Sequence, residues 1–226
     1  MPSLRSDRGC FIVIEGIDGC GSTTHSKRLA KTLKGVGQDV RLTCEPTSGP
    51  IGALIRQVLQ KRLFVPDASG PRAFAWSTMA LLFAADRLDH IDSVVAPALR
   101  EGAVVVSDRY YLSSLVYQSV TAPDGAGALP WITELNRQAP PPDLTIVIDV
   151  PASVAAERRA TRTHATEIFE IPELQERLAR VYAYAEELVP KDRLLHVSGV
   201  GAQDEVALRI LHAVRAAELP VIVPDA

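Results

Sequence analysis

The chain has 226 residues, of which 47 % are hydrophobic and 23 % charged, an ordinary globular balance that predicts one domain. A formal net charge of −3 gives no electrostatic reason to expect a nucleic-acid partner. The first residues lack the apolar core of a signal peptide, and no apolar run reaches membrane-spanning length. Three cysteines, an odd and sparse set, suit reduced thiols. We therefore expect a soluble, cytoplasmic protein without a membrane partner.

Apolar runs and helical patterns alternate along the chain. In order, we predict a strand at 11–15, a helix at 22–34, a strand at 39–44, helices at 51–61 and 72–98, and a strand at 103–106. Helices at 112–120 and 131–138, a strand at 144–150, helices at 153–162 and 172–189, a strand at 194–197 and a helix at 204–218 follow. Because the strands are mostly apolar throughout, the pattern predicts an α/β fold with a parallel sheet covered by helices on both faces.

A glycine-rich stretch, FIVIEGIDGCGSTT, joins the first predicted strand to the first predicted helix and contains Gly16, Gly19 and Gly21. Glycines let successive backbone N–H groups turn inward, and the N-terminus of the following helix adds positive potential, as in a phosphate cradle. The hydroxyl of Thr23 lies where such loops hold magnesium. The pattern G-x-x-x-x-G-K-[ST], however, has Ser22 in place of its lysine. The alternative interpretation is an ordinary strand-to-helix turn.

Polar side chains follow three of the predicted strands. Asp18 lies in the loop after the first, Glu45 follows the second, and Asp108 and Arg109 follow the third. Ligands of parallel sheets bind beyond the carboxyl ends of the strands. We therefore expect a ligand site at this edge of the sheet.

Five stretches resemble the thymidylate kinases: FIVIEGIDGCGSTT, EPTSGPIGALIR, LLFAADR, SDRYYLSSLVYQ and LNRQAPPPDLTIVIDV. They occur in the family's order and span most of residues 11–190. The resemblance implies a three-layer P-loop NTPase fold and transfer of the γ-phosphoryl group of ATP to dTMP, giving dTDP and ADP, with Mg²⁺. It also implies a homodimer. We divide the chain into a lead-in (1–10), a nucleoside monophosphate kinase-like domain (11–218) with a mobile lid at about 158–171, and a tail (219–226).

The resemblance assigns roles to individual positions. The residues assigned to ATP are Gly16, Asp18, Gly19, Cys20, Gly21, Ser22, Thr23, Thr24 and Arg159. Those assigned to dTMP are Asp18, Glu45, Arg56, Phe83, Arg87, Arg109, Ser114, Tyr117 and Gln118. The catalytic set is Asp108, Arg109, Arg158 and Arg162, and the metal set is Thr23 and Asp108.

Each role has a plainer alternative. Asp18 resembles the acid that contacts the sugar 3′-hydroxyl, and a helix-capping aspartate is its alternative. Phe83 resembles the aromatic that stacks on thymine and Arg87 the arginine that reads its O4; a core Phe and a solvated Arg are the alternatives. Arg109 resembles the arginine that grips the acceptor phosphate, with Asp108 acting through metal-bound water. An Asp-Arg pair of purely structural role is the other interpretation.

The chain departs from the family at two positively charged positions. Ser22 replaces the loop lysine, and the lid reads EIFE where Asp-Arg usually precedes an aromatic or apolar residue and Glu. We hypothesise that Arg158, Arg159 and Arg162, at the start of the lid, supply the missing charge, because guanidinium groups suit phosphate oxygens. Two alternatives stay open: a nucleotide-binding homologue with impaired catalysis, and a kinase of another pyrimidine monophosphate such as dUMP.

Overall fold

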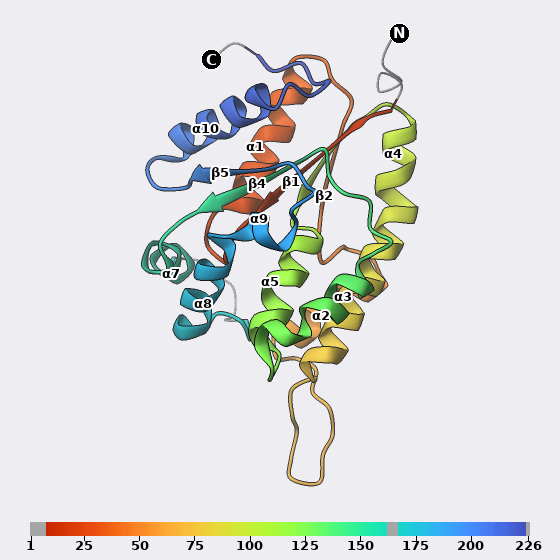
Figure 1. Cartoon of the computed structure of the whole chain (residues 1–226), viewed down its shortest axis with the longest axis vertical. Coiled ribbons are helices and arrows are strands. Elements are labelled where there is room, and N and C mark those ends of the chain that lie inside the picture. The colour runs from red at the N-terminus through yellow and green to blue at the C-terminus, as the bar shows by residue number, and fades with distance from the viewer. Residues whose placement is uncertain (1–7, 162–166, 225–226) are drawn as a thin grey trace.

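The computed structural model describes residues 8–161 and 167–224, in which strands and helices alternate (Figure 1). The elements of the first half are β1 (Cys10–Glu15), α1 (Ser22–Gly35), β2 (Val40–Cys44), α2 (Pro50–Leu59), α3 (Trp76–His90), η1 (Ile91–Val95), α4 (Ala96–Arg100) and β3 (Val104–Asp108). Those of the second half are α5 (Tyr111–Thr121), η2 (Gly125–Ala128), α6 (Leu129–Leu135), β4 (Leu144–Asp149), α7 (Ala152–Ala160), α8 (Pro172–Tyr182), α9 (Ala185–Leu188), β5 (Leu194–Ser198) and α10 (Gln203–Ala216).

The five strands form one sheet in the order β2-β3-β1-β4-β5, and every pairing is parallel. This confirms the predicted α/β fold class. Strand β1 lies at the centre, with Ile14 opposite Asp108 of β3 and Glu15 opposite Val147 of β4. After β1 the chain first adds β2 and β3 on one side of this strand and later adds β4 and β5 on the other side. The loop after β1 therefore lies at the switch point where such sheets bind ligands.

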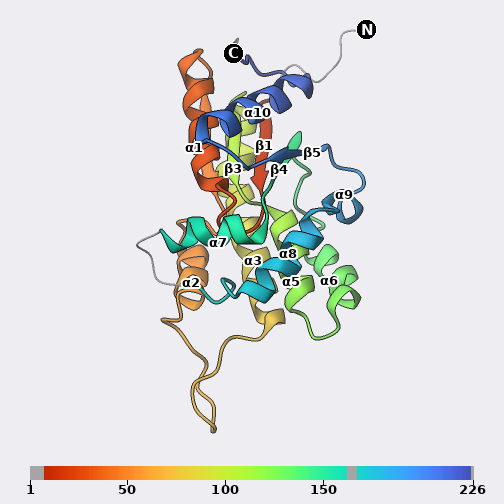
Figure 2. The same ribbon diagram turned by 90° about the vertical axis from the view of Figure 1, so that its left-hand side faces the viewer.

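Helices cover both faces of the sheet. Helices α1 and α10 contact each other, α1 packs on β1 to β3, and α10 packs on β4 and β5. The opposite side carries α5 and α8, which contact each other, and α3, which packs against α5 (Figure 2). This three-layer arrangement leaves the carboxyl edge of the sheet open between the layers.

The central strands lie in the core, as their apolar runs predict, whereas the edge strands β2 and β5 are only partly buried. Every residue of β1 is buried, because the consecutive apolar side chains leave no polar face. Leu29 and Leu33 of α1 are buried against the sheet, and each such side chain contributes about 2 kcal/mol. On the other side, the rings of Phe11 and Tyr110 meet edge to face at 5.0 Å.

The predicted helix over residues 72–98 is wrong at its start and in its interior. Residues 61–75 form an extended arm with a single bridge between Val65 and Arg72, and α3 begins only at Trp76 (Figure 2). After His90 the chain widens into one π-helical stretch before α4. Pro97 explains this widening, because it has no N–H to donate to the preceding turn.

The predicted helix over 172–189 is also divided. Helix α8 ends at Tyr182, and α9 starts at Ala185, because Tyr184 adopts a non-helical conformation (φ −126°, ψ 34°). The other helices differ from their predicted bounds by a few residues at the ends. Among residues 8–161 and 167–224, no helix is long and apolar enough to cross a membrane.

Candidate active site

The glycine loop after β1 is shaped by positions that only glycine fits. Gly19 has φ +95°, and a side chain there would collide with the carbonyl oxygen of Ala155 in α7. Gly21, with φ +99°, is the N-cap of α1 and gives the first N–H groups of that helix no side-chain cap. The capping role considered for Asp18 is therefore wrong. The N-terminus of α1 instead presents backbone donors suited to phosphate oxygens.

Two arginines of α7 lie against this loop. Arg158 donates from Nη1 to the carbonyl oxygen of Cys20 at 3.3 Å and from Nη2 to that of Gly199 at 2.8 Å. Arg159 donates to the carbonyl oxygen of Asp18. Both guanidinium groups are thus held beside the loop whose lysine position is occupied by the buried Ser22. Arg162 and the middle of the predicted lid, residues 162–166, lie outside the described residues.

The end of β3 faces the start of α1. Thr23 Oγ1 donates a hydrogen bond to Asp108 Oδ2 at 2.5 Å. Within the described part of the chain, the other oxygen of this carboxylate, Asp108 Oδ1, is buried without a partner. An ionised carboxylate is an acceptor only, and Mg²⁺ is commonly bound by one or two carboxylates together with phosphate oxygens. The residues present therefore fit a magnesium ion.

Arg109 is held by four groups. Nη1 donates to the carbonyl oxygen of Gly16 at 2.9 Å and to Ser113 Oγ at 3.0 Å. Nη2 pairs with Asp18 Oδ1 at 2.7 Å, and the guanidinium lies 5.2 Å from the centre of the Tyr117 ring. A guanidinium has five N–H donors, so Nε and one N–H of Nη2 have no partner among residues 8–161 and 167–224 and can bind a ligand. Among the ion pairs of the described residues, Arg109 is paired with Asp18 and not with its neighbour Asp108, the pair that the structural alternative named.

Arg87 is buried rather than solvated, because only 2 % of its side chain is exposed. It donates to Glu45 Oε2 from Nε at 2.9 Å and from Nη2 at 2.6 Å. Nη1 donates to Ser114 Oγ at 3.1 Å and also to the side-chain oxygen of Asn136. Within the part of the chain that the structure describes, these bonds use four of its five N–H groups and leave one. The plainer interpretation of Arg87 as a solvated arginine is wrong.

The other oxygen of Glu45 extends this network. Glu45 Oε1 lies 3.0 Å from His90 Nδ1, and His90 Nε2 lies 2.7 Å from Thr43 Oγ1. Sequence reasoning missed both His90 and Asn136. His90 lies one turn after Arg87 on α3, which was an available signal. Asn136 lies in the stretch LNRQAPPPDLTIVIDV, whose resemblance to the family was the other available signal.

A cavity of about 310 Å³ opens at this edge of the sheet. The predicted residues that line it are Asp18, Thr23, Glu45, Arg56, Phe83, Arg87, Asp108, Arg109, Ser114, Tyr117 and Gln118. Phe83 is half-buried at its wall and also packs against a small apolar cluster of the core. Tyr117 and Gln118 each have a buried polar atom, Oη and Oε1, without a partner among the described residues. Arg56 lines the cavity, and its Nη1 donates hydrogen bonds to the carbonyl oxygens of Pro46, at 2.7 Å, and Thr47, at 2.5 Å.

The segment after residues 162–166 closes one side of this cavity. The N–H of Ile168 donates to the carbonyl oxygen of Leu59 in α2 at 3.0 Å. The ring of Phe169 meets that of Tyr117 at 5.5 Å. Gln175 Nε2 joins the carbonyl oxygen of Phe169, at 2.8 Å, to Asp18 Oδ2, at 2.9 Å. Sequence reasoning treated this segment only as part of a flexible lid.

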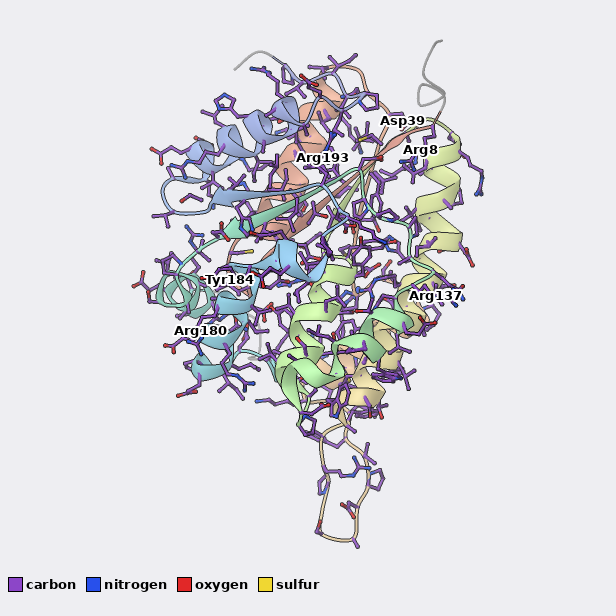
Figure 3. The ribbon with its side chains drawn as sticks, in the orientation of Figure 1. Arg8, Asp39, Arg137, Arg180, Tyr184 and Arg193 are labelled. Carbon is purple, nitrogen blue, oxygen red and sulfur yellow. The ribbon has the colours of Figure 1, made fainter. Side chains whose placement is uncertain are left out.

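The site arginines differ from those on the outer surface. Figure 3 labels Arg8, Arg137 and Arg180 at the edge of the molecule. The pairs Arg8–Asp143 and Arg137–Glu134 are exposed, and such pairs contribute about 0 to 1 kcal/mol. The pair of Arg87 and Glu45 is buried, so removal of either partner would leave an uncompensated charge. Buried charges of this kind concentrate at functional sites.

A glycine loop at the switch point of a parallel sheet, an uncapped helix N-terminus and converging arginines define a P-loop protein that handles phosphorylated nucleotides. The comparisons with known proteins refine this class. The profile of the thymidylate kinase family matches residues 14–207. The chain is 40 % identical over 189 residues to a probable thymidylate kinase of Pyrococcus horikoshii, covering 84 % of this chain and 88 % of that protein. It is 38 % identical over 213 residues to a thymidylate kinase of Xanthomonas oryzae pv. oryzae, covering 93 % and 85 %.

The chain therefore belongs to the thymidylate kinase family, as its motifs indicated. Membership makes it a kinase that phosphorylates dTMP with ATP. The roles of its individual residues, the metal and the assembly go beyond what membership gives.

Proposed function

We propose that this cavity converts dTMP and ATP into dTDP and ADP with the residues that line it in the following roles. Arg109 binds the acceptor phosphate through its free N–H groups, and Asp18 accepts a hydrogen bond from the sugar 3′-hydroxyl. Phe83 stacks on thymine while the remaining N–H of Arg87 binds O4. One observation carries the proposal: Asp108, Arg109 and Arg87 line the same cavity, next to the glycine loop.

The reaction joins an oxygen of the dTMP phosphate to the γ phosphorus of ATP and breaks the bond between that phosphorus and the β–γ bridging oxygen, so ADP leaves. Catalysis of this step is mainly positioning and neutralisation of charge. The N–H groups at the start of α1 bind the phosphates, and Arg109 holds the attacking phosphate in line. Thr23 and Asp108 would hold Mg²⁺, which neutralises the phosphate oxygens when it is bound with ATP.

The substitution at Ser22 requires a replacement for the loop lysine. A unit charge about 4 Å from a phosphate oxygen is worth up to about 4 kcal/mol in a partly screened site, or about a thousandfold in rate. Arg158 and Arg159 already lie against the loop, bound only to backbone carbonyl oxygens, which supports them as that replacement. Among the described residues, no carboxylate forms an ion pair with Arg158 or Arg159. Each guanidinium group can therefore turn to the γ phosphate as the lid (about 158–171) closes.

We further propose that the chain is a cytoplasmic homodimer in which α3 of each copy packs against the other. Leu81 and Leu88, seven residues apart on α3, are 51 % and 37 % exposed. Leu54 of α2, a helix that packs against α3, is also 37 % exposed. Leu81 and Leu88, two helical turns apart, give α3 an exposed apolar stripe. Burial of such a stripe against a second copy would remove it from water.

Ser22 favours a second candidate function, a nucleotide-binding protein that has lost catalysis. The buried network around Arg87 argues against it, because charges held this closely serve an acceptor site in use. A kinase of dUMP is the nearer variant, since uracil presents the same O4.

Release of ADP, measured with Mg²⁺–ATP and a panel of monophosphates, separates the three. We expect turnover with dTMP, weaker turnover with dUMP and none with thymidine. Turnover highest with dUMP would reassign the acceptor. Binding of ATP and dTMP without ADP release in any mixture would favour the non-catalytic alternative.

A further inference from the structure

Glu15 is a carboxylate in the middle of the protein core. It is the last residue of β1, directly before Gly16, and none of its surface is exposed. Four donors surround it. Oε1 accepts from the backbone N–H groups of Tyr110, at 2.8 Å, and Ser113, at 3.2 Å. Oε2 accepts from the hydroxyls of Ser113, at 2.6 Å, and Tyr182, at 2.9 Å.

This set of partners identifies Glu15 as ionised. An ionised carboxylate only accepts hydrogen bonds, and the four donors satisfy its two oxygens. In a protonated carboxylic acid, the O–H group would face one of these donors and make no hydrogen bond with it. The N–H groups belong to the N-cap of α5, Tyr110, and to its first turn, where the helix dipole favours a negative charge. Burial raises the pKa of Glu15 above its usual value, although Arg109 and the hydrogen bonds lower it. The fold therefore holds a carboxylate where a neutral side chain would be less costly to bury.

One of the four donors links Glu15 to the acceptor arginine. The hydroxyl of Ser113 has a single proton, which it donates to Glu15 Oε2. Its lone pairs are consequently left to accept from Arg109 Nη1, at 3.0 Å. The backbone of Arg109 has φ +71°, an uncommon conformation for a residue other than glycine. Contacts such as the one with Ser113 therefore set the direction of the Arg109 side chain.

We propose that Glu15 is a positioning residue, which fixes the guanidinium of Arg109 through the Ser113 hydroxyl so that its free edge meets the acceptor phosphate. This inference rests on the proposed function, because it needs Arg109 to bind that phosphate. Glu15 does not touch the substrate. It orients one hydroxyl, and that hydroxyl orients the arginine.

The test compares dTMP with thymidine, which lacks the phosphate. Glu15→Gln keeps the shape but places an NH₂ group opposite the Ser113 hydroxyl. That hydroxyl must then accept from the NH₂ group, and its proton turns toward Arg109. We expect KM and Kd for dTMP to rise about tenfold or more, with thymidine affinity and kcat at saturating dTMP nearly unchanged. Glu134→Gln, an exposed glutamate, is the matched control.

A role confined to the fold would predict something else: parallel loss of dTMP and thymidine affinity, together with a lower melting temperature. That outcome, or an unchanged ratio of the two affinities, would overturn the proposal. Glu15→Gln in an Arg109→Ala background should add no further loss of dTMP affinity, because the arginine it positions is absent. A full additional loss there would equally overturn it.

If Glu15→Gln does not fold, Ser113→Ala carries the test. It breaks the link while leaving Glu15 in place, and Ser119→Ala on the same helix is its control. We expect Ser113→Ala alone to reduce the preference for dTMP over thymidine; an unchanged preference would overturn the proposal. Wild-type protein that shows no preference for dTMP would instead refute the phosphate role of Arg109, and so the proposed function itself.

Discussion

The hydroxyl of Thr23 donates to the carboxylate of Asp108 at 2.5 Å, across the gap between the start of α1 and the end of β3. This contact joins the glycine loop to the acceptor side of the cavity. The other oxygen of this carboxylate, Asp108 Oδ1, is buried and has no hydrogen-bond partner among the described residues. It is therefore the atom best placed to bind a metal ion or a water molecule on that ion.

Asp108→Asn should therefore lower kcat by about a hundredfold to a thousandfold, because a neutral amide oxygen holds a metal and stabilises charge far less well. The Kd for dTMP should change little. Steady-state kinetics with a magnesium titration measure both, and the variant should need more magnesium. Asp143→Asn is the control, because Asp143 directly precedes β4 and so lies at the edge of the sheet away from the cavity. Equal kcat in the two variants would remove Asp108 from the mechanism.

Ser22→Lys tests whether the glycine loop is impaired as it stands. If the α7 arginines supply the missing charge, a lysine at this buried position should raise kcat by less than about tenfold. Ser22→Met matches the lysine in length without its charge and controls for the added bulk. A gain near a thousandfold, the value of an uncompensated charge, would show that the native site lacks a replacement.

Arg158→Ala should lower kcat by about a hundredfold and raise the KM for ATP, since it removes a cation from the phosphate side of the cavity. Arg158→Lys should recover part of this loss, as it keeps the charge without the fork. Arg180→Ala, on the surface of α8 (Figure 3), is the matched control. Turnover that survives the loss of Arg158 and Arg159 together would end the compensation hypothesis.

Local patterns in the sequence predicted the strands and the glycine loop, and the resemblance to the thymidylate kinases predicted most of the residues that line the cavity. Consecutive apolar residues identified β1, and the motifs placed Arg87 and Arg109. It did not predict the partners of those arginines. Asn136 contacts Arg87 directly, and Glu15 reaches Arg109 only through the hydroxyl of Ser113. Both contacts form between segments that are far apart in the sequence, so the local pattern does not show them. Of the arm at residues 61–75, residues 72–75 were predicted as the start of a helix, and that helix begins at Trp76 instead.

Glu45→Gln should destabilise the fold by about 3 to 5 kcal/mol, because Arg87 would then be buried without its carboxylate. Denaturant unfolding measures the free energy, and the KM for dTMP should rise in parallel as Arg87 loses its orientation. Glu134→Gln breaks the exposed pair with Arg137 and should cost less than about 1 kcal/mol. Similar small losses in both variants would mean that the buried pair contributes no more than a surface one.

Phe169→Ala should open the cavity on the side of the lid. The ring packs against Tyr117 and against the small cluster of Ile55, Val58, Leu59 and Met79, so its removal loses the contact that holds this segment over the site. We expect the KM for dTMP to rise about tenfold and stability to fall by about 1 to 2 kcal/mol, since the ring is only half-buried. Hydrolysis of ATP without dTMP should increase, because a closed lid excludes water from the phosphoryl group.

Ile171→Ala provides the comparison, two residues further along the chain and 52 % exposed. Both changes remove a large apolar side chain from the same segment, but only that of Phe169 reaches the cavity. Coupled assays of ADP release, with and without dTMP, distinguish productive transfer from hydrolysis. If the two variants hydrolyse ATP at the same low rate as wild type, the segment after residue 166 does not act as a seal, and water must be excluded by other residues.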